Sequence, residues 1–213
     1  KFIKRMRDQV GIKAQLVVLD YAADYEGVID VVDTVKEDGG SLIYWMTGAS
    51  AGCALSASLT NMTYDGEYTL NATATQAALI NSIEAGEFRF HKVGTEVRTL
   101  KDQNSLVTLT DDKNSVFQNN ETIRVIDDIA TQIATIFNNR YLGKVKNNDT
   151  GRALLKADIV RYHKELEALQ AIEPLDTDKL SVREGEHKGD VVISEEITVN
   201  ASMEKLYMEV VVG

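Results

Sequence analysis

The chain has 213 residues, of which 44% are hydrophobic and 26% are charged. These values are ordinary for a soluble globular protein and exclude a disordered, collagen-like or membrane-embedded chain. With 33 acidic against 23 basic residues, the net charge of −10 argues against nucleic-acid binding, because phosphate repels an acidic surface.

Two further features concern the chain as a whole. Cys53 is its single cysteine, which excludes an internal disulfide framework and most structural zinc sites. The sequence starts at Lys1, without a methionine and inside a predicted helix. We therefore expect a fragment of a longer protein or a chain whose first part has been removed, so that a targeting signal at the true N-terminus is not visible.

The first forty residues predict one helix and two strands. Residues 1–13 are basic and carry apolar residues at helical spacing, which predicts a short amphipathic helix. The apolar run Ala14–Leu19 predicts a buried strand, and Val28–Val35 predicts a second strand. The pair Gly39-Gly40 predicts a turn.

A stretch without charge follows. Gly39–Tyr64 comprises 26 residues without one charged side chain, but its apolar core, Leu42–Met46, is short. A membrane span needs about 20 predominantly apolar residues. The many small residues of this stretch predict instead a helix packed closely on protein.

Three shorter elements are predicted next. Thr73–Ala85 has the spacing of a helix, which Gly86 ends. Phe88–Leu100 has the pattern of a hairpin with its turn at Gly94. Ser105–Thr110 is either a short strand or an extended segment.

The second half of the chain predicts two long helices and then strands. Glu121–Tyr141 and about Thr150–Gln170 both carry apolar residues at spacings of three and four, and we expect the two helices to pair. After Pro174 the apolar period changes to two. This change predicts three strands, at Leu180–Arg183, Val191–Val199 and Leu206–Val212.

Together these elements predict an α+β fold. We expect a mixed, mostly antiparallel sheet packed with two long helices, and C-terminal strands that form an arm. The predicted domains are a body of residues 1–190, with a possible subdivision near residues 110–120, and an arm of residues 191–213.

One motif suggests an enzyme. Gly48-Ala49-Ser50-Ala51-Gly52 matches the G-x-S-x-G nucleophile elbow of serine hydrolases, with Leu42–Met46 as the preceding strand and three histidines downstream. Small residues are common, however, and the chain lacks the repeated strand–helix alternation of that fold. We therefore keep a small serine hydrolase as an alternative only.

The sequence predicts no metal or cofactor site. His91, His163 and His187 are far apart, and His163 lies among charged neighbours that favour an exposed helix face. The adjacent pairs Asp111-Asp112 and Asp127-Asp128 do not face each other on a helix. No EF-hand, His-Glu-x-x-His or glycine-rich phosphate loop is present. Cys53, among alanines, favours a small buried residue over a nucleophile.

The features that remain point to assembly. The terminal apolar segments need a pairing partner, either within the same domain or on a neighbouring subunit, since open apolar edges aggregate. Charge is also uneven, with seven basic and two acidic residues in 140–164 against four basic and ten acidic residues in 173–213. These stretches are either complementary between copies or simply solvated.

The sequence resembles a known family, the contractile phage tail sheath proteins, over nearly its whole length. The C-terminal run Ser202–Met208 is the most specific part of the likeness. The other segments that carry it are Gly48–Gly52, Ser58–Thr60, Ala85–Phe88, Asn119–Asn147 and Asn148–Leu155, in which Gly151-Arg152 opens the helix. The chain is most similar to the major C-terminal part of the short sheaths of simple contractile tails and phage-tail-like bacteriocins.

The resemblance implies a structural protein without catalysis or cofactor. Sheath subunits form six-fold rings that stack helically around a tube and contract to drive it through a cell envelope. Their terminal arms lend strands to neighbouring subunits. On this chain the implied arm residues are Val191, Ile193, Ile197, Leu206, Tyr207, Met208, Val210 and Val212.

The resemblance also implies partners and a location. Expected partners are other copies, the tail tube, and the baseplate and tail terminator, with neither nucleic acid nor membrane bound. The basic residues Arg140, Lys144, Lys146 and Arg152 are candidates to meet acidic surface on a neighbour or the tube. The expected location is a virion tail or a tail-like particle, assembled in the bacterial cytoplasm. A non-contractile tail or baseplate adaptor stays open as an alternative.

Overall fold

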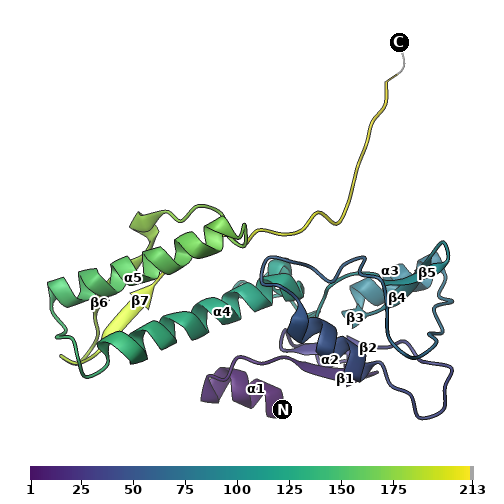
Figure 1. The fold of residues 1–213 in the computed structure, drawn as a ribbon, viewed down its shortest axis with the longest axis horizontal. Helices are drawn as coiled ribbons and strands as arrows, with labels where there is room; N and C mark the ends of the chain where they lie inside the picture. Colours follow the sequence, from purple (N-terminus) through teal and green to yellow (C-terminus); the bar gives the residue numbers. More distant parts are fainter. Residues whose placement is uncertain (212–213) are drawn as a thin grey trace. The chain divides into compact units, whose positions relative to one another are not determined.

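A computed structural model describes residues 1–211 of the chain (Figure 1). The described residues form two compact units. Unit 1 comprises Lys1–Ile123 together with the residues from Ser202 onward, and unit 2 comprises Arg124–Ala201. Each unit contains both helices and small sheets, which confirms the predicted α+β class.

The N-terminal helix of unit 1 forms as predicted. It consists of α1 (Phe2–Arg5), which continues as a π-helical turn over Met6–Val10. Gly11 ends it with φ of 81°, a left-handed conformation that glycine adopts at little cost.

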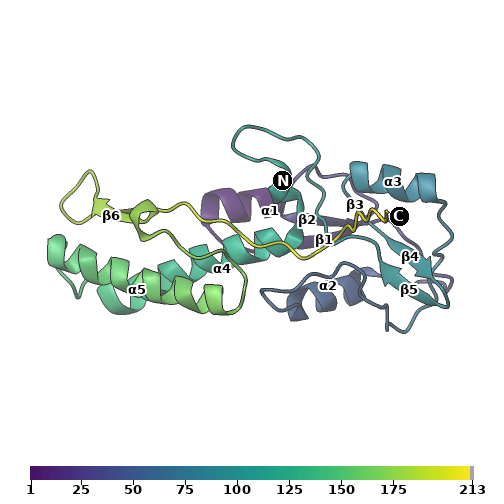
Figure 2. The ribbon, with the colours of Figure 1, turned by 90° about the horizontal axis from the view of Figure 1, so that it is seen from above.

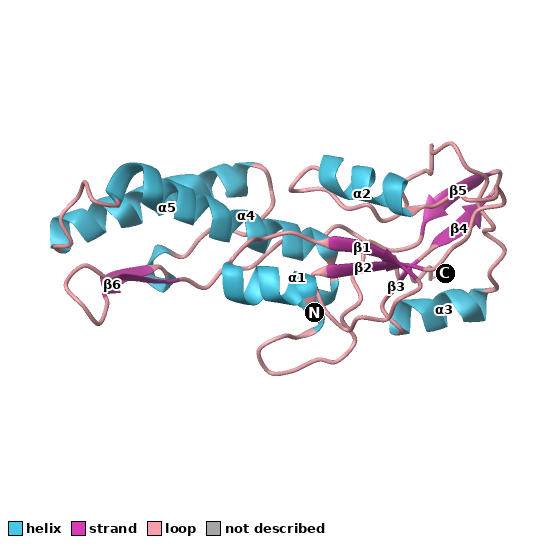
Figure 3. Cartoon of the chain, turned by 90° about the horizontal axis from the view of Figure 1, so that it is seen from below, coloured by secondary structure: helices cyan, strands magenta, loops and turns pink. Residues whose placement is uncertain are grey.

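A parallel sheet follows, in the order β1-β2-β3 (Figure 3). Its strands are β1 (Leu16–Leu19), β2 (Val28–Val31) and β3 (Glu87–Phe88), with Leu16 opposite Val28 and Asp30 opposite Glu87. The four residues of β2 are buried because it is the central strand and both of its faces are covered: Ile29 and Val31 pack in the main core of unit 1, and Val28 packs against Ile3 and Tyr25. The prediction that the β1 segment is buried is wrong: Leu16 and Leu19 are 40% and 44% exposed, because β1 is an edge strand.

Three further elements complete unit 1. They are α2 (Ile43–Gly52), α3 (Gln76–Glu84) and the antiparallel hairpin of β4 (Phe90–Val93) with β5 (Glu96–Thr99). The predicted hairpin and the predicted helix before Gly86 are thereby confirmed. Residues 105–110 lie outside any strand. Of the two predicted alternatives, a short strand or an extended segment, the second is therefore the one that fits. The main core of unit 1 is built from Ile29, Val31, Leu42, Met46, Leu59, Leu70, Phe88 and Phe90.

Two long helices dominate unit 2, as predicted. They are α4 (Asn120–Ile136), whose first turn belongs to unit 1 and which continues as a π-helical turn over Phe137–Tyr141, and α5 (Asp149–Ala168). Figure 2 shows the two helices side by side. The hydroxyl of Tyr162 donates to Asp128 Oδ2 at 2.5 Å and that of Tyr141 to Asp158 Oδ2 at 2.8 Å, so hydrogen bonds join the pair at two levels.

A hairpin of β6 (Ser181–Glu184) and β7 (Val191–Ser194) packs on this helix pair. Tyr141, Leu155, Ile159 and Leu180 form the buried centre of the contact. The third predicted strand does not form in the single chain: residues 206–211 lie in no strand, and Val212 lies outside the described residues. Period-two patterning indicates a segment suited to a sheet, but a strand needs a neighbour to bond with.

Candidate assembly interface

The C-terminal segment is the most exposed apolar part of the described chain. Met203, Leu206, Tyr207, Met208, Val210 and Val211 have exposed fractions between 71% and 102%. Figure 1 shows the segment as an extended trace in yellow. An extended segment with large exposed apolar side chains has the features of a β-strand that lacks a pairing partner. Folded proteins usually avoid exposing such a segment, because it promotes aggregation.

Two contacts within unit 1 fix where this segment begins. The buried carboxylate of Glu121, in the first turn of α4, accepts hydrogen bonds from the Ser202 backbone N–H at 3.1 Å and from its hydroxyl at 3.0 Å. Glu204 Oε1 accepts a hydrogen bond from the Thr60 hydroxyl at 3.3 Å. The segment is therefore held at Ser202 and Glu204 and exposed beyond them.

Sequence patterns did not identify Glu121 as the residue that holds the C-terminal segment. It lies 81 positions from Ser202, and neither residue belongs to a local motif that predicts the other. The one available signal was an acidic residue in the first turn of a helix, which by itself indicates only a favourable interaction with the helix dipole.

The other predicted arm residues occupy a different environment. Val191 and Ile193 belong to β7, opposite Glu184 and Val182 of β6, and pack against the core of unit 2. Ile197 is half-buried in the segment that follows. The start of an exchangeable arm at residue 191 stays a prediction.

The segment after β7 is hydrogen-bonded to the residues that follow α5. The Glu173 N–H donates to Thr198 O at 2.9 Å, and the Asn200 N–H donates to Ala171 O at 3.0 Å. The amide side chain of Asn200 adds a bond to Gln170 O at 2.9 Å. Residues up to Asn200 are thus fastened within unit 2.

The four candidate basic residues differ in how many partners they have. Arg140 forms an ion pair with Asp158 at 3.1 Å, and Arg152 pairs with Asp149 and donates to Asn147 Oδ1 at 2.9 Å. Lys144 donates to the Asn139 carbonyl at 2.6 Å but is exposed, as is Lys146. Arg152, with a side chain that is 16% exposed, is the one that is largely covered. Lys144, Lys146 and Arg140, which is paired but 55% exposed, present charge to solvent.

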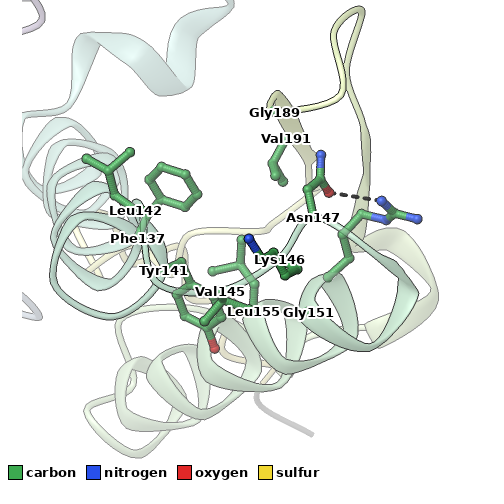
Figure 4. Close-up of a pocket in the computed structure, with 12 residues that line it drawn as sticks. Phe137, Tyr141, Leu142, Val145, Lys146, Asn147, Gly151, Leu155, Gly189 and Val191 are labelled. Carbon is green, nitrogen blue, oxygen red and sulfur yellow. Dashed lines mark hydrogen bonds between the residues drawn. The ribbon is translucent and has the colours of Figure 1, made fainter.

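Three predicted site residues meet in one small pocket of unit 2 (Figure 4). Lys146, Arg152 and Val191 line a cavity of about 80 Å³ together with Phe137, Tyr141 and Leu155, among others. Pockets for small molecules typically measure about 300–1,000 Å³. The pocket is thus too small for a cofactor and has the size of a packing gap between the helix pair and the hairpin.

The serine motif does not form a nucleophile elbow. Residues 43–46 lie in α2 itself and not in a strand, so Ser50 is in the last turns of a helix. The elbow chemistry needs a sharp strand-to-helix turn that exposes the serine hydroxyl. The expected close helix packing is also wrong at the glycines, because Gly48 and Gly52 are exposed and an added Cβ would meet no atom within 4 Å.

The histidines do not assemble a catalytic group. His91 lies on β4 and His187 in the β6–β7 loop. His163, predicted to be exposed, is fully buried: Nδ1 lies 2.9 Å from Ile159 O, and Nε2 lies 3.3 Å from Glu195 Oε2. Since a carbonyl can only accept, Nδ1 donates to it, and Nε2 faces the carboxyl group.

We expect this pair of a buried histidine and a half-buried glutamate to make the stability of the fold depend on pH. Burial raises the pKa of Glu195 from its ordinary 4.5, and His163 opposes the rise only in part. The folded state therefore holds this proton more tightly, so its contribution to stability is complete below pH 4.5 and is lost as the pH rises through the raised pKa. We expect Glu195→Gln, which mimics the protonated acid, to remove that dependence.

The measurement is urea unfolding across a pH series. Within the window, the difference in unfolding free energy between parent and Glu195→Gln should change by about 1.4 kcal/mol per pH unit. Glu196→Gln is the matched control, because the adjacent Glu196 is exposed. Parallel pH profiles for the parent and Glu195→Gln would contradict the assignment.

Within residues 1–211, no group of three or more histidine, cysteine, aspartate or glutamate side chains is placed to hold a metal ion. Over the same residues, no helix combines the length and the apolar character that crossing a bilayer requires.

Fold and surface together define a class of protein. The described residues form two compact units and an apolar segment that is anchored at its start and exposed beyond, which fits a structural protein with a surface suited to strand addition. Comparison with known proteins agrees. Residues 1–105 match the family described as phage tail sheath protein central domain, and residues 112–213 match the phage tail sheath C-terminal domain.

Individual relatives support the same family. The chain is 30% identical over 227 aligned residues to the phage-like element PBSX protein XkdK of Bacillus subtilis, covering 100% of this chain and 49% of the relative. Its structure is similar to that of the sheath tail protein from Desulfitobacterium hafniense, with a TM-score of 0.84 and 35% identity over 97% of this chain and 50% of that one.

A solved structure with much lower sequence identity also has a similar fold. The sheath complex of an extracellular contractile injection system in its contracted state matches 89% of this chain and 57% of that one, with a TM-score of 0.70 at 9% identity. The chain belongs to the phage tail sheath family, whose members are structural proteins. It spans about half the length of the curated relatives it matches.

Proposed function

We propose that this chain is the greater part of a contractile sheath subunit. Copies assemble into stacked hexameric rings around a tail tube and contract to drive the tube through a cell envelope. The observation that carries the proposal is the exposed apolar segment from Leu206 to Val211 on a chain of the sheath family. The likeness to a sheath complex in the contracted state supports it at the level of the fold.

Strand addition is the proposed linking device. The segment beyond Glu204 of one subunit pairs with a strand of its neighbour, and each backbone hydrogen bond contributes about 0.5–1.5 kcal/mol net. The anchor at Glu121 sets the point from which the segment extends. Links of this kind persist while the subunit bodies shift, so contraction draws its energy from new contacts between bodies.

The remaining partners follow from the same proposal. The exposed Lys144 and Lys146 meet acidic surface on a neighbouring subunit or on the tube, while Arg140 and Arg152 serve mainly their own unit. Baseplate and tail terminator bind the ends of the stack. The subunit binds no nucleic acid, membrane or cofactor, catalyses no reaction, and assembles in the host cytoplasm into a virion tail or a tail-like particle.

The test is electron microscopy of the natural full-length protein and of a truncation that lacks residues 205–213. We expect hollow striated tubes from the full-length protein and none from the truncation. The truncation spares β7 and the Ser202 anchor, so both units keep their described contacts. Single rings from both proteins would instead support the adaptor alternative, and monomers from both would refute self-assembly.

A further inference from the structure

The parallel sheet of unit 1 has one closed edge and one open edge. At the β3 edge, the side chain of Gln103 donates from Nε2 to the outward carbonyl of Glu87 at 2.8 Å. On the same side of β2, the Ser105 N–H donates to Val28 O at 2.8 Å. The backbone of β2 is therefore covered on both sides, and that of β3 is capped by a side chain.

The β1 edge is different. The Leu16 N–H donates to Gly27 O at 2.9 Å and the Asp20 N–H to Val31 O at 3.0 Å, so alternate residues of β1 face β2. In a strand, the intervening residues present their backbone groups to the other side. The N–H and C=O groups of Val17 and Leu19 therefore point out of the sheet.

Apolar side chains surround this open edge. Leu16 pairs with Val28 and so lies on the face of the sheet against which Ile3 of α1 packs. Side chains alternate along a strand, so Leu19 lies on the other face with Val17, which packs against the core that contains Met46 of α2. Beside them Phe2 and Tyr21 are exposed, and these side chains line a cavity of about 240 Å³ with Leu16. A parallel sheet is normally covered on both faces, and an open edge flanked by apolar side chains is a place where a further strand can pair, so this region lacks a neighbour.

The chain order indicates what that neighbour is. The helix of residues 2–10 lies on one face of the sheet, a five-residue loop follows, and β1 then runs parallel to β2. This is the second half of a strand–helix–strand unit, in which the first strand lies in the same sheet, parallel to the second, with a right-handed crossover. Since both sides of β2 and the outer side of β3 are covered, the open place is beside β1.

We propose that a strand supplied by the chain N-terminal to α1 pairs in parallel with β1. Sheath relatives carry about as much sequence again, and the two matched regions are their central and C-terminal domains, so the additional part precedes the matched one. Carbonyl groups of the added strand accept hydrogen bonds from the outward N–H groups of Val17 and Leu19, and its side chains cover Leu16, Phe2 and Tyr21. The inference rests on membership of the family and not on sheath assembly.

The test is residue-resolved hydrogen exchange on the natural longer protein, diluted until it is monomeric. We expect the amides of Val17 and Leu19 to exchange on the order of 100-fold more slowly than exposed amides, as part of the folded sheet. The amides of Val18 and Asp20, which face β2, are the internal control and should be protected equally.

Two results would overturn the proposal. The first is fast exchange at Val17 and Leu19 beside slow exchange at Val18 and Asp20, which would mean that the edge is open in the longer protein as well. The second is protection that appears only at concentrations where the protein assembles, because a second copy would then be the occupant. A longer protein that fails to form tubes but shows the expected protection would refute the proposed function and leave this inference standing.

Discussion

Replacing Leu206, Met208 and Val210 together with serine should abolish assembly of the full-length protein and leave the unfolding temperature of the monomer unchanged. Side chains alternate along a strand, so these three share one face, while Glu209 lies on the other face with Tyr207. They are exposed in the single chain, so their loss costs the monomer little. On pairing, burial of each contributes about 1.5–3 kcal/mol, and the loss recurs at every subunit contact.

Sedimentation and electron microscopy measure assembly, and thermal unfolding measures the monomer. The matched control is the double variant Tyr207→Ser with Val211→Ser, which alters the face that carries Glu209. We expect this control to weaken assembly without preventing it. Normal tubes from the triple variant would show that the apolar face of the segment is not what binds the neighbour, and the proposed linking device would have to be abandoned.

Local patterns predicted the helices well because periodicity is a local property. The spacings within Glu121–Tyr141 and Thr150–Gln170 match α4, its π-helical turn and α5 to within one or two residues. The same helical spacing could also have placed His163 correctly. His163 continues the spacing of Leu155 and Ile159 on the buried face of α5, but its charged neighbours favoured exposure.

Pairings between distant segments could not be predicted in the same way. An apolar run indicates a strand but not its partner, and β2 at residue 28 pairs with β3 at residue 87. The parallel order of this sheet and the edge position of β1 are therefore findings of the structure. The anchor between Glu121 and Ser202 is similar, since both side chains have ordinary local contexts and meet only through the fold.

Gly151 shows how one small residue positions the candidate interface. A Cβ added there would lie 2.1 Å from the carbonyl oxygen of Lys146, a backbone atom that cannot rotate away. The loop before α5 can pass so close to the helix only because residue 151 has no side chain. That course places the amide of Asn147, which donates to Lys188 O at 3.0 Å and Asp190 O at 2.8 Å and so holds the β6–β7 loop.

Gly151→Ala should therefore destabilise unit 2 by about 1–3 kcal/mol, the typical cost of forcing extra atoms into a packed site. Gly48→Ala is the matched control: it is also a helical glycine, but it is exposed with open space around it, and we expect a gain of about 0.5–1 kcal/mol. Urea unfolding measures both. Because the clash moves the loop that carries Lys144 and Lys146, Gly151→Ala should also impair assembly under conditions in which it is still folded. Equal effects of the two substitutions on stability would mean that helix propensity, and not the close approach of the Lys146 carbonyl, decides the residue at position 151.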